Sequence, residues 1–288
     1  MKEQRYIIEN CKTFEPKHIF DCGQCFRWNI QEDGSYTGVF KENVLNVKKE
    51  KDRIIFTGIC KGNIKDIVKD YFDFDTNYEE IKEKLSNVDE YLKESIEFGS
   101  GIRILNQDLW ETIISFIISA NNNIPRIKGI IEKISKQYGN KIIWNNEEYY
   151  TFPTPEELGK VSVDDLRKLG LGFRDKRVYE TTKIILEGSI KLQELKQEKD
   201  TIILKEKLLT LPGVGPKVAD CIMLFGLKRF EVFPIDVWVR RVMNDLYIKN
   251  EDETKINKKE IEKLAVDKYK NLAGLAQQYL FYWKRETA

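Results

Sequence analysis

The feature that most constrains this 288-residue sequence is a Gly- and Pro-rich turn between two apolar helical runs. It reads "LPGVGPKVADCIMLFG" over residues 211–226. The runs on either side have the apolar spacing of helices, so the sequence predicts a helix-hairpin-helix at about residues 202–227. Gly213 and Gly215 can adopt positive φ and have no Cβ, so we expect their amides to approach a ligand closely.

The start of the second helix is predicted to bind an anion. Amide groups at a helix N-terminus point outward, and the helix dipole there favours negative charge. A hairpin with this geometry holds a phosphate without reading the base sequence. The turn therefore indicates a backbone anion site; the alternative is a plain connector between two helices.

Lys217 lies in the first turn of this second helix and is predicted to be a nucleophile. We expect burial and the positive helix end to disfavour its ammonium form, which would lower its pKa. Asp236 follows nineteen residues later in "FPIDVW", where it can cap the next helix and stabilise positive charge. Singly, these residues are typical of a solvated lysine and an ordinary helix cap; the combined pattern is more specific.

The rest of the chain divides into a strand-rich part and a helical part. Short segments with β-branched or aromatic residues and period-two alternation predict an antiparallel sheet at residues 6–14, 25–30, 35–40, 43–50 and 53–60. Helical spacing predicts helices at residues 63–72, 78–99, 107–120, 124–139, 154–161, 162–170, 174–188, 201–211, 216–227, 235–247, 258–269 and 272–285. We therefore expect an α+β fold, with a sheet domain and trailing helices over 1–98 and a mostly helical, two-lobed body over 99–288.

Composition and cysteine content exclude several classes. No apolar run approaches the ~20 residues of a membrane span, and the N-terminus has no signal-peptide core, so we expect a cytoplasmic protein. The 48 basic and 47 acidic residues leave nucleic-acid binding open. Cys22 and Cys25 form a C-x-x-C motif, but strand-like sequence follows it, which disfavours a thioredoxin-like site. His18 is the only histidine, so a zinc site is also disfavoured.

The segment from Leu211 to Val237 resembles the helix-hairpin-helix DNA glycosylases of base-excision repair, and further motifs resemble their 8-oxoguanine DNA glycosylase family over nearly the whole chain. The resemblance implies that Lys217 attacks the sugar C1′ and forms a Schiff base, and that Asp236 is the essential aspartate of the family. No cysteine follows Cys221, which disfavours the iron–sulfur branch. The resemblance implies no cofactor and no catalytic metal, and it leaves open whether the hairpin binds a structural cation.

The resemblance also implies a pocket for the damaged base. "CGQCFRW" is similar to the family motif in which a glycine carbonyl, here that of Gly23, accepts the N7–H found on oxidised guanine. Normal guanine has an acceptor at N7 and would be repelled. "AGLAQQYLFYW" implies that Gln277 reads the flipped base and that Phe281 stacks on it, four residues along one helix face. Cys221 is implied to contact the other side of the base.

Contacts to the opposite strand follow from two more motifs. "SANNNIPRIKG" resembles the segment in which Asn121 and Arg126 read the cytosine left unpaired. "GLGFRDKR" implies that Phe173 is a wedge in the base stack and that Arg174 is a second cytosine reader. Trp238 replaces a family histidine near the DNA backbone, which puts a phosphate contact there in doubt.

We therefore expect a bifunctional glycosylase and abasic-site lyase that excises 8-oxoguanine opposite cytosine from damaged double-stranded DNA. We expect it to be a monomer without membrane partners, associated with the nucleoid of a prokaryote. Three alternatives remain: a relative acting on alkylated or other bases, a DNA-binding module without catalysis, and a thiol oxidoreductase using Cys22 and Cys25. The absence of borohydride trapping on 8-oxoguanine DNA would indicate the first. DNA binding without base release would indicate the second, and activity that depends on Cys22 would indicate the third.

Overall fold

The computed structural model describes residues 2–252 and 256–288. The strands are β1 (Glu3–Ile8), β2 (Trp28–Ile30), β3 (Tyr36–Phe40), β4 (Asn43–Glu50), β5 (Arg53–Ile59), β6 (Lys141–Trp144) and β7 (Glu147–Tyr150). The α-helices of the first half are α1 (Pro16–Phe20), α2 (Ile64–Tyr71), α3 (Tyr78–Ser86), α4 (Glu90–Phe98), α5 (Leu109–Ser119) and α6 (Ile124–Tyr138). Those of the second half are α7 (Pro155–Leu158), α8 (Val163–Lys168), α9 (Asp175–Leu186), α10 (Leu192–Gln197), α11 (Thr201–Leu209), α12 (Pro216–Leu227), α13 (Val237–Met243), α14 (Lys258–Tyr269) and α15 (Ala273–Thr287). Short 3-10 or π turns are η1 (Gly172–Arg174), η2 (Asn244–Ile248) and η4 (Lys270–Leu272).

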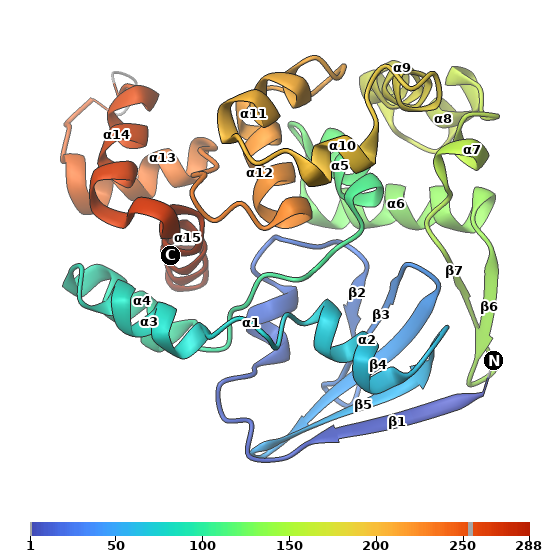
Figure 1. Ribbon diagram of the computed structural model, residues 1–288, viewed down its shortest axis with the longest axis horizontal. Helices are drawn as coiled ribbons and strands as arrows, with labels where there is room; N and C mark the ends of the chain where they lie inside the picture. The colour runs from blue at the N-terminus through green and yellow to red at the C-terminus, as the bar shows by residue number, and fades with distance from the viewer. Residues whose placement is uncertain (1, 253–255) are drawn as a thin grey trace.

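The N-terminal part is a five-stranded antiparallel sheet in the order β1-β5-β4-β3-β2 (Figure 1). Strands β3, β4 and β5 lie where the sequence predicts them. The predicted strand over residues 6–14 is wrong beyond residue 8, because the chain leaves the sheet there and forms α1 at residue 16. Phe14, Trp28 and Phe56 are fully buried in the core of this sheet.

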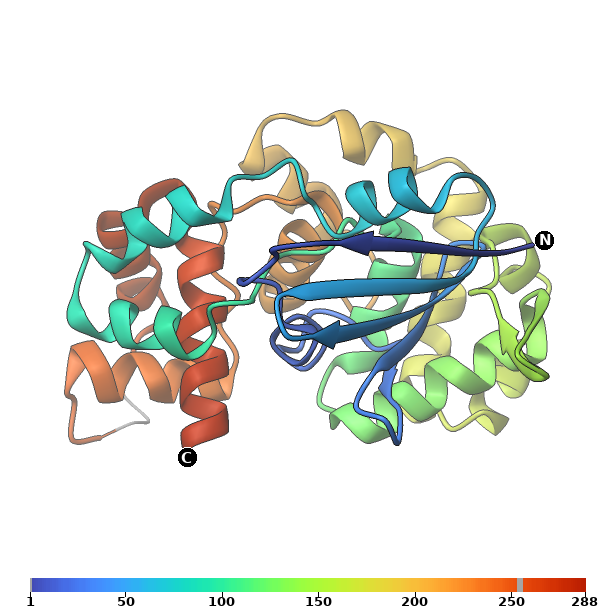
Figure 2. The same cartoon turned by 90° about the horizontal axis from the view of Figure 1, so that it is seen from below.

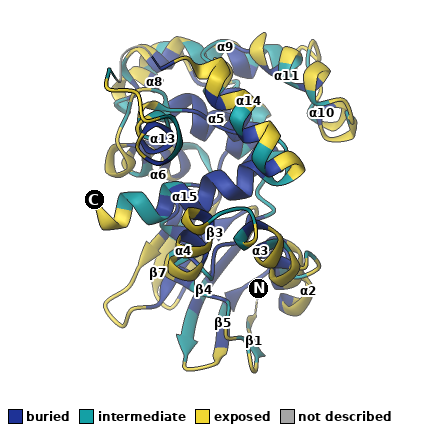
Figure 3. Ribbon diagram, turned by 90° about the vertical axis from the view of Figure 1, so that its left-hand side faces the viewer, coloured by how far each residue is buried: buried dark blue, intermediate teal, exposed yellow. Residues whose placement is uncertain are grey.

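The rest of the chain is mostly helical, which confirms the predicted α+β fold. Helix α5 is apolar on most faces and is buried, as expected. The side chain of Asn123 caps α6, and those of Thr154 and Ser162 cap α7 and α8. The predicted helix over 78–99 is two helices, because Asp89 takes an extended conformation and caps a new helix, α4. Figure 3 shows α5 and much of α15 in the dark blue of buried residues.

A β-hairpin within the helical part, β6–β7, joins the two halves of the molecule. It was not expected from the sequence, and its turn residues Asn145 and Asn146 both have positive φ. Trp144 packs against the sheet residues Val44 and Ile59, and its indole N–H donates to the Glu3 carboxylate over 2.7 Å. Figure 1 shows the hairpin descending from the helical body to the strand β1.

Helices α3 and α4 lie within residues 1–98 of the sequence but pack with the helical body. Figure 2 shows the pair beside α15, and Leu85, Leu92 and Ile96 belong to the hydrophobic core of that body. The division of the chain at residue 98 stays a prediction. Among the described residues, no helix is both long and apolar enough to cross a membrane.

Candidate active site

A cavity of about 150 Å³ lies between the N-terminal part and the helices α12, α13 and α15. All six residues that the sequence assigns to catalysis and to the damaged base line it: Gly23, Lys217, Cys221, Asp236, Gln277 and Phe281. They come from segments far apart in the chain. The fold therefore brings the predicted catalytic pair and the predicted base pocket into one cavity.

The hairpin before α12 has one glycine with positive φ and one without. Gly213 has φ +86°, and a Cβ there would lie 2.7 Å from the Arg177 side chain. Gly215 has φ −91° and is the N-cap of α12, so of the two glycines only Gly213 adopts positive φ. A Cβ on Gly215 would have no atom within 4 Å, so its exposed backbone can be approached closely.

The pKa of Lys217 is raised, so the predicted lowering of this pKa is wrong. The Cys221 sulfur raises it most, burial opposes this, and the Asp236 carboxylate raises it further. Burial raises the pKa of the Cys221 thiol to about 11, so at neutral pH the thiol is protonated and Asp236 provides the negative charge. Lys217 is thus held as an ammonium ion and must lose a proton before it can attack.

Asp236 is held rigidly at the start of α13. Its carboxylate accepts a hydrogen bond of 2.7 Å from the Val239 amide, which confirms the predicted cap. Lys217 and Asp236 line the same cavity, and their charges interact without a direct ion pair between them. The carboxylate is therefore placed to stabilise positive charge that develops within the cavity.

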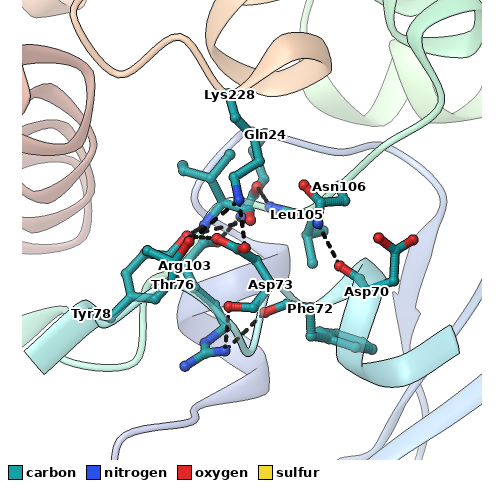
Figure 4. A network of polar contacts seen from close by, with 11 residues as sticks. Gln24, Asp70, Phe72, Asp73, Thr76, Tyr78, Arg103, Leu105, Asn106 and Lys228 are labelled. Atoms are coloured by element: carbon teal, nitrogen blue, oxygen red, sulfur yellow. Dashed lines mark hydrogen bonds and ion pairs between the residues drawn. The ribbon is translucent and has the colours of Figure 1, made fainter. Parts of the chain in front are cut away.

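Gly23 lies in the loop after α1 with φ +87°, a conformation that favours glycine. The neighbouring Gln24 fixes this loop. Its side-chain amide donates to the Arg103 carbonyl over 2.8 Å, and its Oε1 accepts from the Leu105 amide over 2.9 Å (Figure 4). The same network reaches α12, because Lys228 at the end of that helix forms an ion pair with Asp73. The loop that carries Gly23 is thus tied to the helix that carries Lys217.

Helix α15 supplies the opposite wall of the cavity. Gln277 is 4% exposed, and its side-chain oxygen accepts from the Gln278 amide over 2.8 Å. Phe281 lies one turn later, with its Cε1 atom 3.6 Å from the position of a Cβ on Gly23. An amide and an aromatic ring on one helix face can read the edge and the face of a planar ligand.

The predicted opposite-base readers lie together outside this cavity. Asn121 and Arg126 are exposed, and Arg126 donates to the Gly170 carbonyl over 3.2 Å. Arg174 is 2% exposed, and its guanidinium donates to the carbonyls of Ala120 and Asn121 over 2.7 to 2.9 Å. In the structure Arg174 holds the Asn121 segment, so it must release these carbonyls before it can contact a base.

Phe173 and Trp238 differ in their access to a ligand. Phe173 is 55% exposed, with the guanidinium carbons of Arg174 and Arg177 at 4.3 and 4.9 Å from its ring centre. An exposed ring flanked by two cations is suited to stacking beside a polyanion. The indole N–H of Trp238 is buried without a hydrogen-bond partner among the described residues, so it does not reach a surface phosphate here.

The C-x-x-C motif is not a redox site in the structure. Cys22 and Cys25 are free thiols that are 1% and 5% exposed. Burial raises the pKa of Cys22 to about 11 and that of Cys25 well above its usual value. Reactive thiols need the opposite, an accessible site with a lowered pKa.

Sequence reasoning missed several cavity residues. Phe116 on α5 places its ring centre 5.6 Å from the Lys217 Nζ, and Asn122 lines the cavity next to the predicted Asn121. Arg285 also lines the cavity, and it follows Gln277 and Phe281 at the same four-residue spacing. That spacing was a usable signal for Arg285, whereas Phe116 was indistinguishable from a core aromatic residue.

Comparison with known proteins gives two family matches that together cover most of the chain. Residues 6–113 match the N-terminal domain of 8-oxoguanine DNA glycosylase. Residues 114–278 match the HhH-GPD superfamily of base excision DNA repair proteins.

Similar proteins agree with these matches. A probable N-glycosylase/DNA lyase of Methanothermobacter thermautotrophicus is 33% identical over 69% of this chain and 68% of its own length. The 8-oxoguanine glycosylase/lyase of Clostridium acetobutylicum, solved with double-stranded DNA containing cytosine opposite 8-oxoguanine, superimposes with a TM-score of 0.93 at 41% identity, covering 99% of this chain and 97% of its own. The 3-methyladenine DNA glycosylase of Archaeoglobus fulgidus shares the fold alone, with a TM-score of 0.79 at 21% identity over 98% of this chain and 99% of its own.

One assignment follows from the helix-hairpin-helix with its half-buried lysine, the capping aspartate on the same cavity and the family matches over both halves. The chain belongs to the HhH-GPD superfamily of base excision DNA repair proteins, in the branch that carries the N-terminal domain of 8-oxoguanine DNA glycosylases.

Proposed function

We propose that the protein is a bifunctional DNA glycosylase/lyase that excises 8-oxoguanine opposite cytosine from duplex DNA. The observation that carries this proposal is the single cavity lined by the Lys217 amine, the Asp236 carboxylate and the base-facing groups of Gly23, Gln277 and Phe281. The similar glycosylase/lyase of Clostridium acetobutylicum supports the same substrate.

The damaged base is read by its altered edge. Oxidation at C8 places a hydrogen on N7, and the Gly23 carbonyl accepts it, whereas the N7 lone pair of guanine would face that carbonyl. Phe281 and Cys221 enclose the two faces of the flipped base, and Gln277 contacts its Watson–Crick edge. The fixed conformation of the Gly23 loop gives this test its geometric precision.

Excision begins with nucleophilic substitution at the sugar. Lys217 first loses a proton to solvent, and its Nζ lone pair then forms a bond to C1′. The N9–C1′ bond breaks, its electron pair leaves with the base, and the base takes the second amine proton. Asp236 stabilises the positive charge that develops on the sugar in the transition state. These two roles require that the Lys217 amine and the Asp236 carboxylate line the same cavity, and both residues do so.

Strand cleavage follows from the same covalent adduct. The C1′–O4′ bond opens as the Lys217 nitrogen forms a double bond to C1′, and the amine proton moves to O4′. Removal of a proton from C2′ then expels the 3′ phosphate by β-elimination. Water hydrolyses the resulting imine and regenerates Lys217. No electron is gained or lost, so these steps require no redox cofactor.

DNA is held by two further regions. The amides at Gly213 and Gly215 and the start of α12 bind a phosphate, and Phe173 fills the gap left by the flipped base. The cytosine left unpaired is contacted by Asn121, Arg126 and Arg174, once Arg174 has released its present backbone partners. A phosphate contact by Trp238 is not part of this proposal, because its indole N–H is buried. A location with the nucleoid in the cytoplasm follows from the proposed substrate.

A panel of duplexes tests the proposal. Base release and strand cleavage are measured under single-turnover conditions for 8-oxoguanine, 3-methyladenine and undamaged guanine, each opposite all four bases. We expect release of 8-oxoguanine, fastest opposite cytosine, with strand cleavage on the same duplex. Release of 3-methyladenine in preference would instead indicate a relative for alkylated bases. DNA binding without any release would indicate a binding module.

A further inference from the structure

Arg285 on α15 lines the same cavity and has one hydrogen-bonding nitrogen without a partner. Its Nη2 donates to the Asp21 carbonyl, and its Nε and Nη2 reach the Glu286 carboxylate at 3.2 and 3.1 Å. Its Nη1 is buried and has no hydrogen-bond partner among the described residues. A buried charged donor without a partner costs free energy, so this nitrogen suggests a site that a ligand completes.

The unpaired nitrogen faces the glycine that reads the damaged base. A Cβ on Gly23 would lie 3.8 Å from Arg285 Nη1 and 3.6 Å from Phe281 Cε1. The guanidinium carbon lies 5.2 Å from the centre of the Phe281 ring. Gly23, the edge of the Phe281 ring and the Arg285 guanidinium therefore lie next to one another at the cavity, with the guanidinium over the ring.

We propose that Arg285 is a specificity-determining residue that donates a hydrogen bond from Nη1 to a carbonyl oxygen of the damaged base. The inference rests on the proposed function. The altered edge of 8-oxoguanine presents an acceptor, O6, then the N7–H donor, then a second acceptor, O8. A donor beside the Gly23 carbonyl matches one of the two oxygens that flank N7–H.

The bond to Asp21 explains how an arginine can serve this purpose without selecting normal guanine. A free guanidinium prefers guanine, because two of its N–H groups pair with O6 and N7 together. In this protein Nη2 is occupied by the Asp21 carbonyl in the same loop as Gly23, which leaves Nη1 to act alone. The same bond fixes the guanidinium relative to the Gly23 carbonyl.

Positive charge at this position also favours base release. When the N9–C1′ bond breaks, its electron pair enters the purine and spreads onto the carbonyl oxygens. A hydrogen bond from a guanidinium to such an oxygen strengthens as this charge develops, so it lowers the barrier to excision. The Phe281 ring now covers Nη1 and must turn for a base to reach it.

Arg285→Ala and Tyr36→Phe together test the proposal. Tyr36 donates to the Asp21 carboxylate over 2.8 Å, so Tyr36→Phe loosens the same loop without changing the cavity wall. Two reactions are measured for each protein: excision of 8-oxoguanine, and cleavage of a preformed abasic site, which has no base to contact. Thermal unfolding verifies that both variants fold.

We expect Arg285→Ala to slow excision about 10- to 100-fold, the loss of a charged hydrogen bond, and to leave abasic-site cleavage within about threefold of wild type. We expect Tyr36→Phe to stay within about threefold in both reactions. Excision of 8-oxoadenine, which keeps O8 but has an amino group at C6, identifies the oxygen that Arg285 contacts. If Arg285→Ala slows the excision of both bases equally, the contact is to O8. If it slows only the excision of 8-oxoguanine, the contact is to O6.

Three results would overturn the inference. Wild-type rates of excision in Arg285→Ala would remove the base contact and leave the proposed function intact. Parallel losses in excision and abasic-site cleavage, shared by Tyr36→Phe, would show that Arg285 only supports the loop. A wild-type protein that does not excise 8-oxoguanine would remove the proposed function, and the inference with it.

Discussion

The cavity for the damaged base and the surface for the opposite strand are built differently. Around the cavity, Cys221 and Gln277 are 3% and 4% exposed, and the Gly23 loop is fixed by buried hydrogen bonds. On the opposite-strand surface, Phe173 is 55% exposed and Arg126 is also exposed. Arg174 there is occupied by backbone carbonyls. The backbone of the cavity is therefore fixed before DNA binds and only side chains such as Phe281 must turn, whereas Arg174 on the surface must release backbone hydrogen bonds to read a base.

This difference predicts a separation of effects. Changes in the cavity should lower the rate of excision whatever base lies opposite, because they act on the lesion and on the sugar. Changes on the surface should alter the preference for cytosine more than the rate itself. Five substitutions, with one control variant, test this separation.

Asp236→Asn should have the largest effect. Removing the carboxylate charge that stabilises the cationic transition state should lower the rate of excision by about 10² to 10³-fold opposite every base. Asn caps helices as well as Asp, so the hydrogen bond to the Val239 amide survives and the thermal midpoint should change little. Single-turnover rates and thermal unfolding measure the two quantities. A loss of less than about tenfold would show that the carboxylate charge is not used in this way.

Gly23→Ala should follow. Its φ of +87° is unfavourable for alanine by about 1–2 kcal/mol, so the carbonyl that reads N7–H should shift. We expect excision of 8-oxoguanine to fall about 10- to 100-fold while cleavage of a preformed abasic site is spared. Gly34→Ala is a matched control, because Gly34 has φ +78°, open space around it and no place in the cavity. Equal losses in the two variants would indicate general strain instead of lost recognition.

Arg126→Ala should change discrimination. We expect the ratio of excision rates opposite cytosine and opposite adenine to fall about tenfold, the value of one base-reading contact, with little change in stability. Arg174→Ala should lower the same ratio and also destabilise the fold by about 1–3 kcal/mol, because it leaves the carbonyls of Ala120 and Asn121 unpaired. Rates on the two duplexes and denaturant unfolding provide the comparison. An unchanged ratio in both variants would remove these residues from cytosine reading.

Cys221→Ala should have the smallest effect, a shift in pH dependence. The raised pKa of Lys217 keeps it protonated at neutral pH, so the fraction of neutral amine, and with it the rate, should increase as the pH rises. The Cys221 thiol is protonated over this pH range, so its removal takes away only its hydrogen bond with Lys217; this should lower the pKa of Lys217 slightly and shift the rate profile slightly to lower pH. Rates of borohydride trapping on an abasic site between pH 6 and 9 measure the shift without a base in the pocket. A profile that moves to higher pH would contradict this assignment.

Local signals predicted much of the fold. Helix α12 begins at a proline after a glycine, and α14 covers the residues that its apolar spacing indicates. The β6–β7 hairpin was not predicted, because its turn is Asn145-Asn146 and lacks the glycine that most often marks such turns. Helix α1 was not predicted, because it is short, has no capping side chain and lies within a run of predicted strands.

The sequence predicted which residues line the cavity better than it predicted their pKa values and hydrogen bonds. Motif spacing singled out the proposed catalytic pair and the proposed base-facing residues, and the fold gathers all of them at one cavity. The raised pKa of Lys217 was not predicted, because it depends on how close the fold brings Asp236 and on how that attraction and the neighbouring Cys221 outweigh burial. The burial of Arg174 and the contact between Arg285 and the Asp21 carbonyl also join residues far apart in sequence, which no local pattern reveals.

The central claim is that Lys217 attacks the sugar of an 8-oxoguanine nucleotide, and one measurement tests it directly. Wild-type protein and Lys217→Gln are incubated with duplexes containing 8-oxoguanine or guanine opposite cytosine, in the presence of borohydride, and the cross-linked peptide is identified by mass spectrometry. We predict a cross-link on Lys217 with the 8-oxoguanine duplex alone, and none in the variant. A cross-link to another lysine, or equal trapping by the guanine duplex, would contradict the account.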